Sequence, residues 1–174
     1  MWRQVARGFD QRLALVAADN WDSPTCCSDW NVAELVRHAV DAQRFVPKAL
    51  GASGDIDAEG DDFVDVWRRV YASADGIFGQ PASMGSVVQL PFGEMTAAEG
   101  LGFPTADLLI HTWDLARAIG TDDRLDLDTC AVVYARLLPL DEGLRGSGFF
   151  GPKLTASPDA DAQEQLLAFV GRRV

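Results

Sequence analysis

The residues best suited to chemistry lie in one segment, Asp107-Leu-Leu-Ile-His-Thr-Trp-Asp114, where a histidine falls between two carboxylates. On an α-helix, residues three and four positions apart share a face, so Asp107, His111 and Asp114 are expected to point the same way. A carboxylate and an imidazole one turn apart are the arrangement with which helix bundles build metal sites. The chain has only two histidines, so the other one, His38, is the natural candidate for a further ligand.

His38 lies within a second predicted helix, which runs from Asn31 to about Leu50. The start, Asn31-Val-Ala-Glu34, has the form of a capping box. One stripe of this helix combines His38 with apolar residues: Leu35, Ala42, Phe45, Val46 and Ala49. A polar ring on such a face needs a partner, because an unpaired buried polar group costs about 1–3 kcal/mol.

If the two helices pack side by side, His38, Asp107 and His111 point into the same interior. Two imidazoles and a carboxylate, with positions left for water or substrate, suit a catalytic type of divalent metal site. Nitrogen and oxygen ligands fit zinc, nickel, iron or manganese, and zinc or nickel is preferred here. The predicted metal ligands are therefore His38, Asp107 and His111.

Each of these residues also has a structural explanation, and such explanations usually hold for isolated polar residues on apolar faces. Asp107 could be a first-turn acid of a helix that begins at Thr105. Either histidine could be a core residue bonded to a backbone carbonyl. The metal hypothesis gains from the fact that both histidines fall on predicted buried faces.

Asp114, one turn beyond His111, is predicted to have a supporting role. It could accept a hydrogen bond that orients the imidazole of His111. The alternatives are an ion pair with Arg117, or a bond to the indole of Trp30 or Trp113.

The cysteines, Cys26, Cys27 and Cys130, are an odd number with two adjacent members, which is no disulfide framework. Free structural thiols are the simple interpretation of all three. Cys26 and Cys27 precede the helix that carries His38, but nothing in their spacing places them at the site.

Composition limits the class of protein. The 174 residues suggest one domain over 1–174. The net charge of -11 argues against nucleic acid and against an anionic membrane surface as partners. No apolar run approaches the roughly 20 residues of a spanning helix, and the N-terminus lacks the apolar core of a signal peptide. A cytoplasmic location is expected.

The chain is predicted to be mainly helical. Helices are expected over residues 2–18, 62–78, 107–119 and from Asp126 or Asp128 to Leu138, with a last helix opened by Ser157-Pro158. Residues 51–61 are expected to form a solvated loop. Residues 79–95 are expected to be a long crossover that contains a short strand at 86–90 or a short hairpin, with a turn at 91–93. A second capping box, Thr96-Ala-Ala-Glu99, should open a helix that kinks near Pro104 or restarts at Thr105.

Several segments resemble the N-terminal domain of mycothiol-dependent maleylpyruvate isomerase, in the actinobacterial metal-binding branch of the DinB-like superfamily. They are Pro24-Thr-Cys-Cys-Ser-Asp-Trp-Asn-Val-Ala-Glu-Leu-Val-Arg-His38, Pro91-Phe-Gly93, Asp107 to Gly120 and Leu166 to Arg172. The resemblance implies an up-down-down-up four-helix bundle with a divalent metal held by His38, Asp107 and His111. The isomerase has Glu where this chain has Asp107. It also has a further C-terminal domain that contributes to its active site, so maleylpyruvate isomerisation itself is not expected.

The functional hypothesis is a metal-dependent, thiol-dependent transferase or isomerase-like enzyme. Its expected partners are a small-molecule thiol such as mycothiol and a small electrophilic substrate, and a homodimer is left open. The main alternative is a non-catalytic protein of the same fold that binds a metal or a small molecule. A metal hydrolase is a weaker alternative.

Overall fold

Residues 1–27, 29–52, 58, 60, 62–91, 93–146 and 150–174 are described by the structure, a computed structural model. The chain divides into two units, Met1–Asp123 and Arg124–Val174, which we describe separately. The single domain expected over 1–174 stays a prediction. Most of the predicted loop at 51–61, and Phe92 of the predicted turn, lie outside the described residues.

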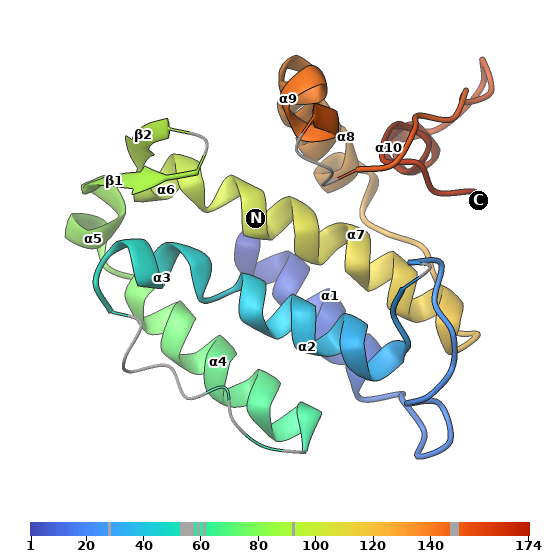
Figure 1. The fold of residues 1–174 in the computed structure, drawn as a ribbon, viewed down its shortest axis with the longest axis horizontal. Coiled ribbons are helices and arrows are strands. Elements are labelled where there is room, and N and C mark those ends of the chain that lie inside the picture. The colour runs from blue at the N-terminus through green and yellow to red at the C-terminus, as the bar shows by residue number, and fades with distance from the viewer. Residues whose placement is uncertain (28, 53–57, 59, 61, 92, 147–149) are drawn as a thin grey trace. The chain divides into compact units, whose positions relative to one another are not determined.

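Four helices of the first unit form a bundle: α1 (Trp2–Leu13), α2 (Val32–Ala42), α4 (Phe63–Phe78) and α7 (Gly102–Ala118). In Figure 1, α1 and α7 run in one direction, and α2 and α4 run in the opposite one. Helix α7 packs against α1 and α2, and α4 packs against the same two helices. The predicted all-α, up-down-down-up bundle is therefore confirmed.

Helix α2 begins with the predicted capping box. The Glu34 N–H donates to Asn31 Oδ1 at 2.9 Å, and the Asn31 N–H donates to Glu34 Oε2 at 2.8 Å. The helix is shorter than predicted, because it ends at Ala42 and a five-residue helix, α3 (Phe45–Ala49), follows. Pro47 explains the break, since it has no N–H to donate to the carbonyl of Gln43. Helix α1 likewise ends at Leu13 and not near residue 18.

The crossover from α4 to α7 contains the predicted hairpin. After a short helix that the sequence did not predict, α5 (Pro81–Gly85), strands β1 (Val87–Leu90) and β2 (Gly93–Thr96) pair antiparallel. Helix α6 (Ala97–Gly100) opens with the predicted capping box, in which the Glu99 N–H donates to Thr96 Oγ1 at 3.2 Å.

The chain then restarts as α7 at Gly102, earlier than the predicted Thr105, and Pro104 lies in the first turn of the new helix. A proline is tolerated there because first-turn N–H groups have no partner within the helix. At the other end, Gly120 has a φ of 69°, the left-handed conformation that commonly ends a helix. The helix was predicted to end at residue 119, one residue beyond its observed end at Ala118.

The second unit holds α8 (Leu127–Leu137), the 3-10 helix η2 (Leu138–Leu140), α9 (Asp141–Gly146) and α10 (Ala162–Phe169). Helix α8 is capped by Asp126, one of the two predicted caps, and packs against α10. The predicted start of the last helix at Ser157-Pro158 is wrong. Asp161 is the N-cap, and it forms a capping box with Glu164 that satisfies two N–H groups at once.

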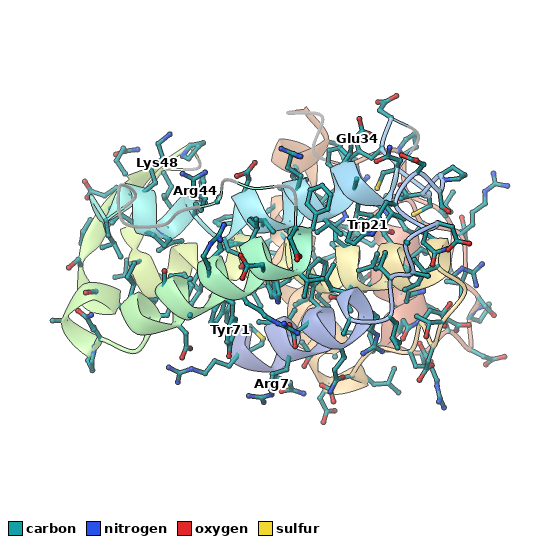
Figure 2. The ribbon with its side chains drawn as sticks, turned by 90° about the horizontal axis from the view of Figure 1, so that it is seen from below. Arg7, Trp21, Glu34, Arg44, Lys48 and Tyr71 are labelled. Carbon is teal, nitrogen blue, oxygen red and sulfur yellow. The ribbon has the colours of Figure 1, made fainter. Side chains whose placement is uncertain are left out.

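Charged side chains cover outward faces of the first unit. Arg7, Glu34 and Lys48, labelled in Figure 2, are all exposed. Among the described residues, no helix combines the length and the apolar character needed to cross a membrane.

The capping box of α2 supports the helix that carries His38, so its loss should destabilise the first unit. We expect Asn31→Ala to lower the free energy of unfolding by about 1 kcal/mol, because N-cap replacements by alanine cost about 0.5–2 kcal/mol. Urea denaturation followed by circular dichroism measures the change. Asn31→Asp is the matched control and should retain most of the stability. Equal midpoints for the alanine variant and the wild type would contradict this role.

Candidate metal centre

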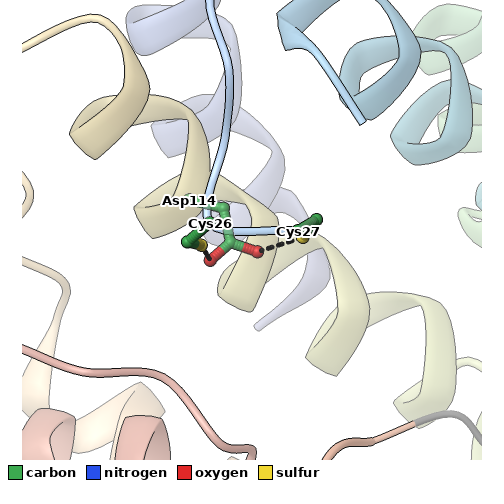
Figure 3. A group of neighbouring side chains, drawn as sticks. All are labelled: Cys26, Cys27 and Asp114. Atoms are coloured by element: carbon green, nitrogen blue, oxygen red, sulfur yellow. Dashed lines mark hydrogen bonds between the residues drawn. The ribbon is translucent and has the colours of Figure 1, made fainter. Parts of the chain in front are cut away.

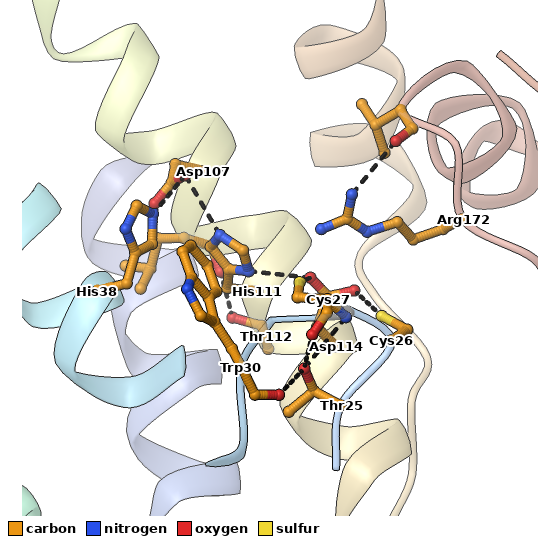
Figure 4. Close-up of polar contacts among 12 residues, drawn as sticks. Thr25, Cys26, Cys27, Trp30, His38, Asp107, His111, Thr112, Asp114 and Arg172 are labelled. Carbon is orange, nitrogen blue, oxygen red and sulfur yellow. Dashed lines mark hydrogen bonds and ion pairs between the residues drawn. The ribbon is translucent and has the colours of Figure 1, made fainter. Parts of the chain in front are cut away.

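Helices α2 and α7 bring the two histidines to one carboxylate. His38 Nε2, from α2, lies 3.2 Å from Asp107 Oδ1, and His111 Nε2 lies 3.4 Å from the same oxygen (Figure 4). One ligand atom from each residue lies within 4.8 Å of the others. The three residues singled out from the sequence therefore form one cluster with metal-ligand spacing.

The cluster is buried at His111 and more open at His38 and Asp107. The His111 side chain is 7% exposed, whereas those of His38 and Asp107 are 37% and 32% exposed. The expectation that His38 sits within the buried stripe of its helix is therefore wrong. The buried residues of α2 are Val32, Leu35, Val36, Ala39 and Val40, and His38 lies at the edge of that face. This edge leaves a side from which water or a small molecule can approach.

The two carboxylate oxygens of Asp107 differ in their contacts. Both imidazoles approach Oδ1, while Oδ2 is buried and has no hydrogen-bond partner among the described residues. A buried polar atom without a partner costs about 1–3 kcal/mol, and more when the group is charged. A cation bound between Asp107 and the two rings would satisfy this oxygen, so the residues present fit a divalent metal ion.

Asp114 orients His111 from the other side of the ring. The carboxylate is fully buried, and its Oδ2 lies 2.9 Å from His111 Nδ1. A proton held on Nδ1 leaves Nε2 as the nitrogen available to a metal. Arg117, weighed from the sequence as a partner of Asp114, pairs with Asp123 at 3.2 Å and lies over the Trp113 ring.

The close contacts shift the pKa values of two groups in opposite directions. Burial works to raise the pKa of Asp107, but the charges of His111 and His38 and their hydrogen bonds hold it well below its usual range. Burial works to lower the pKa of His111, but Asp107, followed by Asp114 and Cys27, holds it well above its usual range. These contacts favour the protonated form of His111, which lies between two carboxylates.

Trp30 forms a wall of the cluster that the sequence did not predict. Its ring centroid lies 4.5 Å from that of His38 and 5.7 Å from that of His111. The only signal was the position of Trp30 within the segment from Pro24 to His38 that resembles the isomerase domain.

The adjacent thiols also reach the neighbourhood of the cluster. Cys26 Sγ lies 2.8 Å from Asp114 Oδ1 and Cys27 Sγ lies 3.5 Å from Asp114 Oδ2 (Figure 3). None of the three cysteines is in a disulfide, as predicted; Cys26 is exposed and Cys27 is half-buried. Cys130, in the second unit, is buried, and burial together with nearby acidic groups raises its pKa to about 12.

The fold and the cluster define a four-helix bundle with two histidines and a carboxylate between α2 and α7. Residues 2–83 match the family of the mycothiol maleylpyruvate isomerase N-terminal domain. Two uncharacterized proteins of Mycobacterium tuberculosis, Rv0738 of strain ATCC 25618 / H37Rv and MT0763 of strain CDC 1551 / Oshkosh, are each 33% identical over 175 residues. Each alignment covers 95% of this chain and 92% of the relative.

The chain therefore belongs to the mycothiol maleylpyruvate isomerase N-terminal domain family. The family match includes His38 and ends before Asp107 and His111. No solved structure matches the chain.

The contact between Asp114 and His111 predicts the effect of removing that carboxylate. In the metal-free protein, we expect Asp114→Asn to lower the pKa of His111, because a charge that stabilises the imidazolium is lost. Proton NMR titration of the two histidines measures it, with His38→Gln used for assignment. Asp41→Asn, an exposed residue of α2, removes the same formal charge and should leave the titration unchanged.

The raised pKa of His111 also makes the stability of the metal-free protein depend on pH. A folded-state pKa above the unfolded value stabilises the metal-free protein fully below about pH 6.5 and loses this effect as the pH rises through the folded value. Asp114→Asn should therefore lower the free energy of unfolding most below about pH 6.5. An unchanged His111 titration in Asp114→Asn would contradict the orienting role.

Proposed function

We propose that this chain binds one divalent metal ion through His38, Asp107 and His111 and acts as a thiol-dependent transferase or isomerase-like enzyme on a small electrophile. One observation carries the proposal. Two imidazoles from different helices converge on one carboxylate, whose second oxygen is buried without a hydrogen-bond partner among the described residues. The nitrogen and oxygen donors favour zinc or nickel.

A divalent ion held there would supply one property, a lowered pKa for a coordinated thiol, which makes a thiolate available at neutral pH. The residues of the chain do the rest. Asp114 holds the proton of His111 on Nδ1, so that Nε2 faces the cluster. The Trp30 ring covers both histidines and limits the access of water. The half-exposed side of His38 leaves an entry for the thiol and the substrate.

Family membership supports a low-molecular-weight thiol, such as mycothiol, as the partner. The isomerase that the chain resembles carries Glu where this chain has Asp107, which is shorter by one methylene. The distances of 3.2 Å and 3.4 Å from Asp107 Oδ1 to the two rings indicate that the shorter side chain still reaches the cluster. The cytoplasmic location stays a prediction.

The ligand set predicts which substitutions abolish metal binding. We expect His38, Asp107 and His111 together to hold one equivalent of Zn²⁺ or Ni²⁺ tightly. His38→Ala or Asp107→Asn should weaken binding at this site by at least about 100-fold, since even loss of an outer partner of a ligand typically costs 10–100-fold. Asp107→Glu, which restores the carboxylate of the isomerase, should bind. Asp41→Asn should bind like the wild type.

Isothermal titration calorimetry with both metals measures these affinities. In buffers of different ionisation enthalpy it also measures proton release. We expect release in the wild type at neutral pH, because His111 must lose its Nε2 proton to become a ligand. Binding that is equally tight in His38→Ala and Asp107→Asn would contradict the site.

The thiol requirement makes a separate prediction. Metal-loaded protein should bind mycothiol with an increase in ultraviolet thiolate absorbance, and His38→Ala should show neither the metal nor this increase. Turnover of a panel of small electrophiles should then depend on both metal and thiol.

The outcome of this experiment discriminates between the candidate functions. Metal binding without thiol binding in the wild type would favour the non-catalytic, binding-only alternative. Hydrolysis of esters or amides without added thiol would favour a metal hydrolase. Either result would overturn the thiol-dependent enzyme.

A further inference from the structure

A second group of ligand-type side chains lies beside the first. Cys26 and Cys27 come from the loop before α2, and Asp114 comes from α7 (Figure 3). One donor atom from each of these residues lies within 4.8 Å of the others. Neither thiol is in a disulfide. The cluster is distinct from the one at His38, Asp107 and His111, although Asp114 contacts His111 through Oδ2.

The loop holds the two cysteines in place through its own hydrogen bonds. Thr25 Oγ1 accepts the Cys27 N–H at 3.1 Å and donates to the Trp30 carbonyl at 2.8 Å. The Trp30 N–H donates to the Cys27 carbonyl at 2.9 Å, and Pro24 forms a β-bridge with Asn31. The thiols are therefore positioned by the fold of the loop itself, and a ligand that uses both of them would not have to order the segment.

The electrostatic environment of Asp114 favours a cation. Buried charges in proteins are usually paired or coordinate metals, and Asp114 is fully buried. The Sγ atoms of Cys26 and Cys27 contact its two oxygens, and a thiol is a weak hydrogen-bond donor. His111 lies between Asp114 and Asp107, so even one full positive charge on this ring would face two carboxylates.

We propose that Cys26, Cys27 and Asp114 form a second metal site, which binds a thiophilic cation such as Zn²⁺ or Cd²⁺. Two sulfur ligands select soft cations over the hard ones that oxygen ligands prefer. On binding, each thiol releases its proton to solvent and forms a metal–sulfur bond, and no oxidant is needed. For tetrahedral zinc, with Zn–S of about 2.3 Å, ligand atoms are about 3.5–3.8 Å apart. The distances of 2.8 Å and 3.5 Å therefore require the thiols to move only slightly.

The exposure of Cys26 leaves the outer side of this site open to a fourth ligand from solvent. The site does not depend on the proposed enzyme function, because none of its three donor residues is a ligand of the histidine cluster, although Asp114 also contacts His111. It also differs from that site in metal preference, since it offers sulfur where the other offers nitrogen.

Cadmium titration of the reduced protein tests the proposal, because cadmium–thiolate bonds give a charge-transfer absorption in the ultraviolet. We expect the wild type to develop this band and to saturate it at about one equivalent. Cys26→Ala/Cys27→Ala should lose the band, and Asp114→Asn should weaken the cadmium affinity of the site by at least about tenfold. Cys130→Ala is the matched control, because it removes the remaining thiol, and it should keep the full band. Circular dichroism checks that each variant is folded.

A further variant distinguishes metal binding at the two proposed sites. His38→Ala/Asp107→Asn should lose the nickel or zinc bound at the histidine cluster and keep the cadmium–thiolate band. Retention of the band in that variant upholds the second site even if the proposed enzyme function fails. A wild type without the band, a band that survives in Cys26→Ala/Cys27→Ala, or an unchanged cadmium affinity in Asp114→Asn would overturn the proposal.

Discussion

The packing of α2 against α7 is the constraint on which the site depends. Each helix alone carries only part of the cluster, because His38 is on α2 whereas Asp107 and His111 are on α7. Side by side, they direct His38 and His111 to the same oxygen of Asp107, at 3.2 Å and 3.4 Å. The capping box at Asn31 sets where α2 begins, and the left-handed Gly120 ends α7. These local features support the helices whose packing creates the cluster.

His111 links the two groups of ligand-type side chains. Its Nε2 faces Asp107 and its Nδ1 faces Asp114, which in turn accepts contacts from the two adjacent thiols. This arrangement concentrates carboxylate charge in a mostly buried region, where such charge is costly without cations. The two proposed metal sites, one with nitrogen and oxygen donors and one with sulfur and oxygen donors, would each place a cation next to this charge.

The sequence predicted the features that depend on interactions between residues close together in the chain. The spacing of Asp107 and His111 and the capping boxes at Asn31 and Thr96 depend on neighbours within one helical turn, and the structure contains all of them. The half-exposure of His38 depends on how helices pack, and spacing placed it wrongly. The contact between Cys26 and Asp114 joins residues 88 positions apart. The spacing of apolar residues along the sequence carries no information about such a contact, so only the fold could reveal it.

The central claim is that His38, Asp107 and His111 hold one metal ion, and anomalous diffraction from crystals of the zinc- or nickel-loaded protein tests it most directly. The account predicts an anomalous peak at about 2.0–2.2 Å from the Nε2 atoms of both histidines and from an oxygen of Asp107. A fully loaded protein with no peak at this position, and with both imidazoles still directed at Asp107 Oδ1, would contradict it.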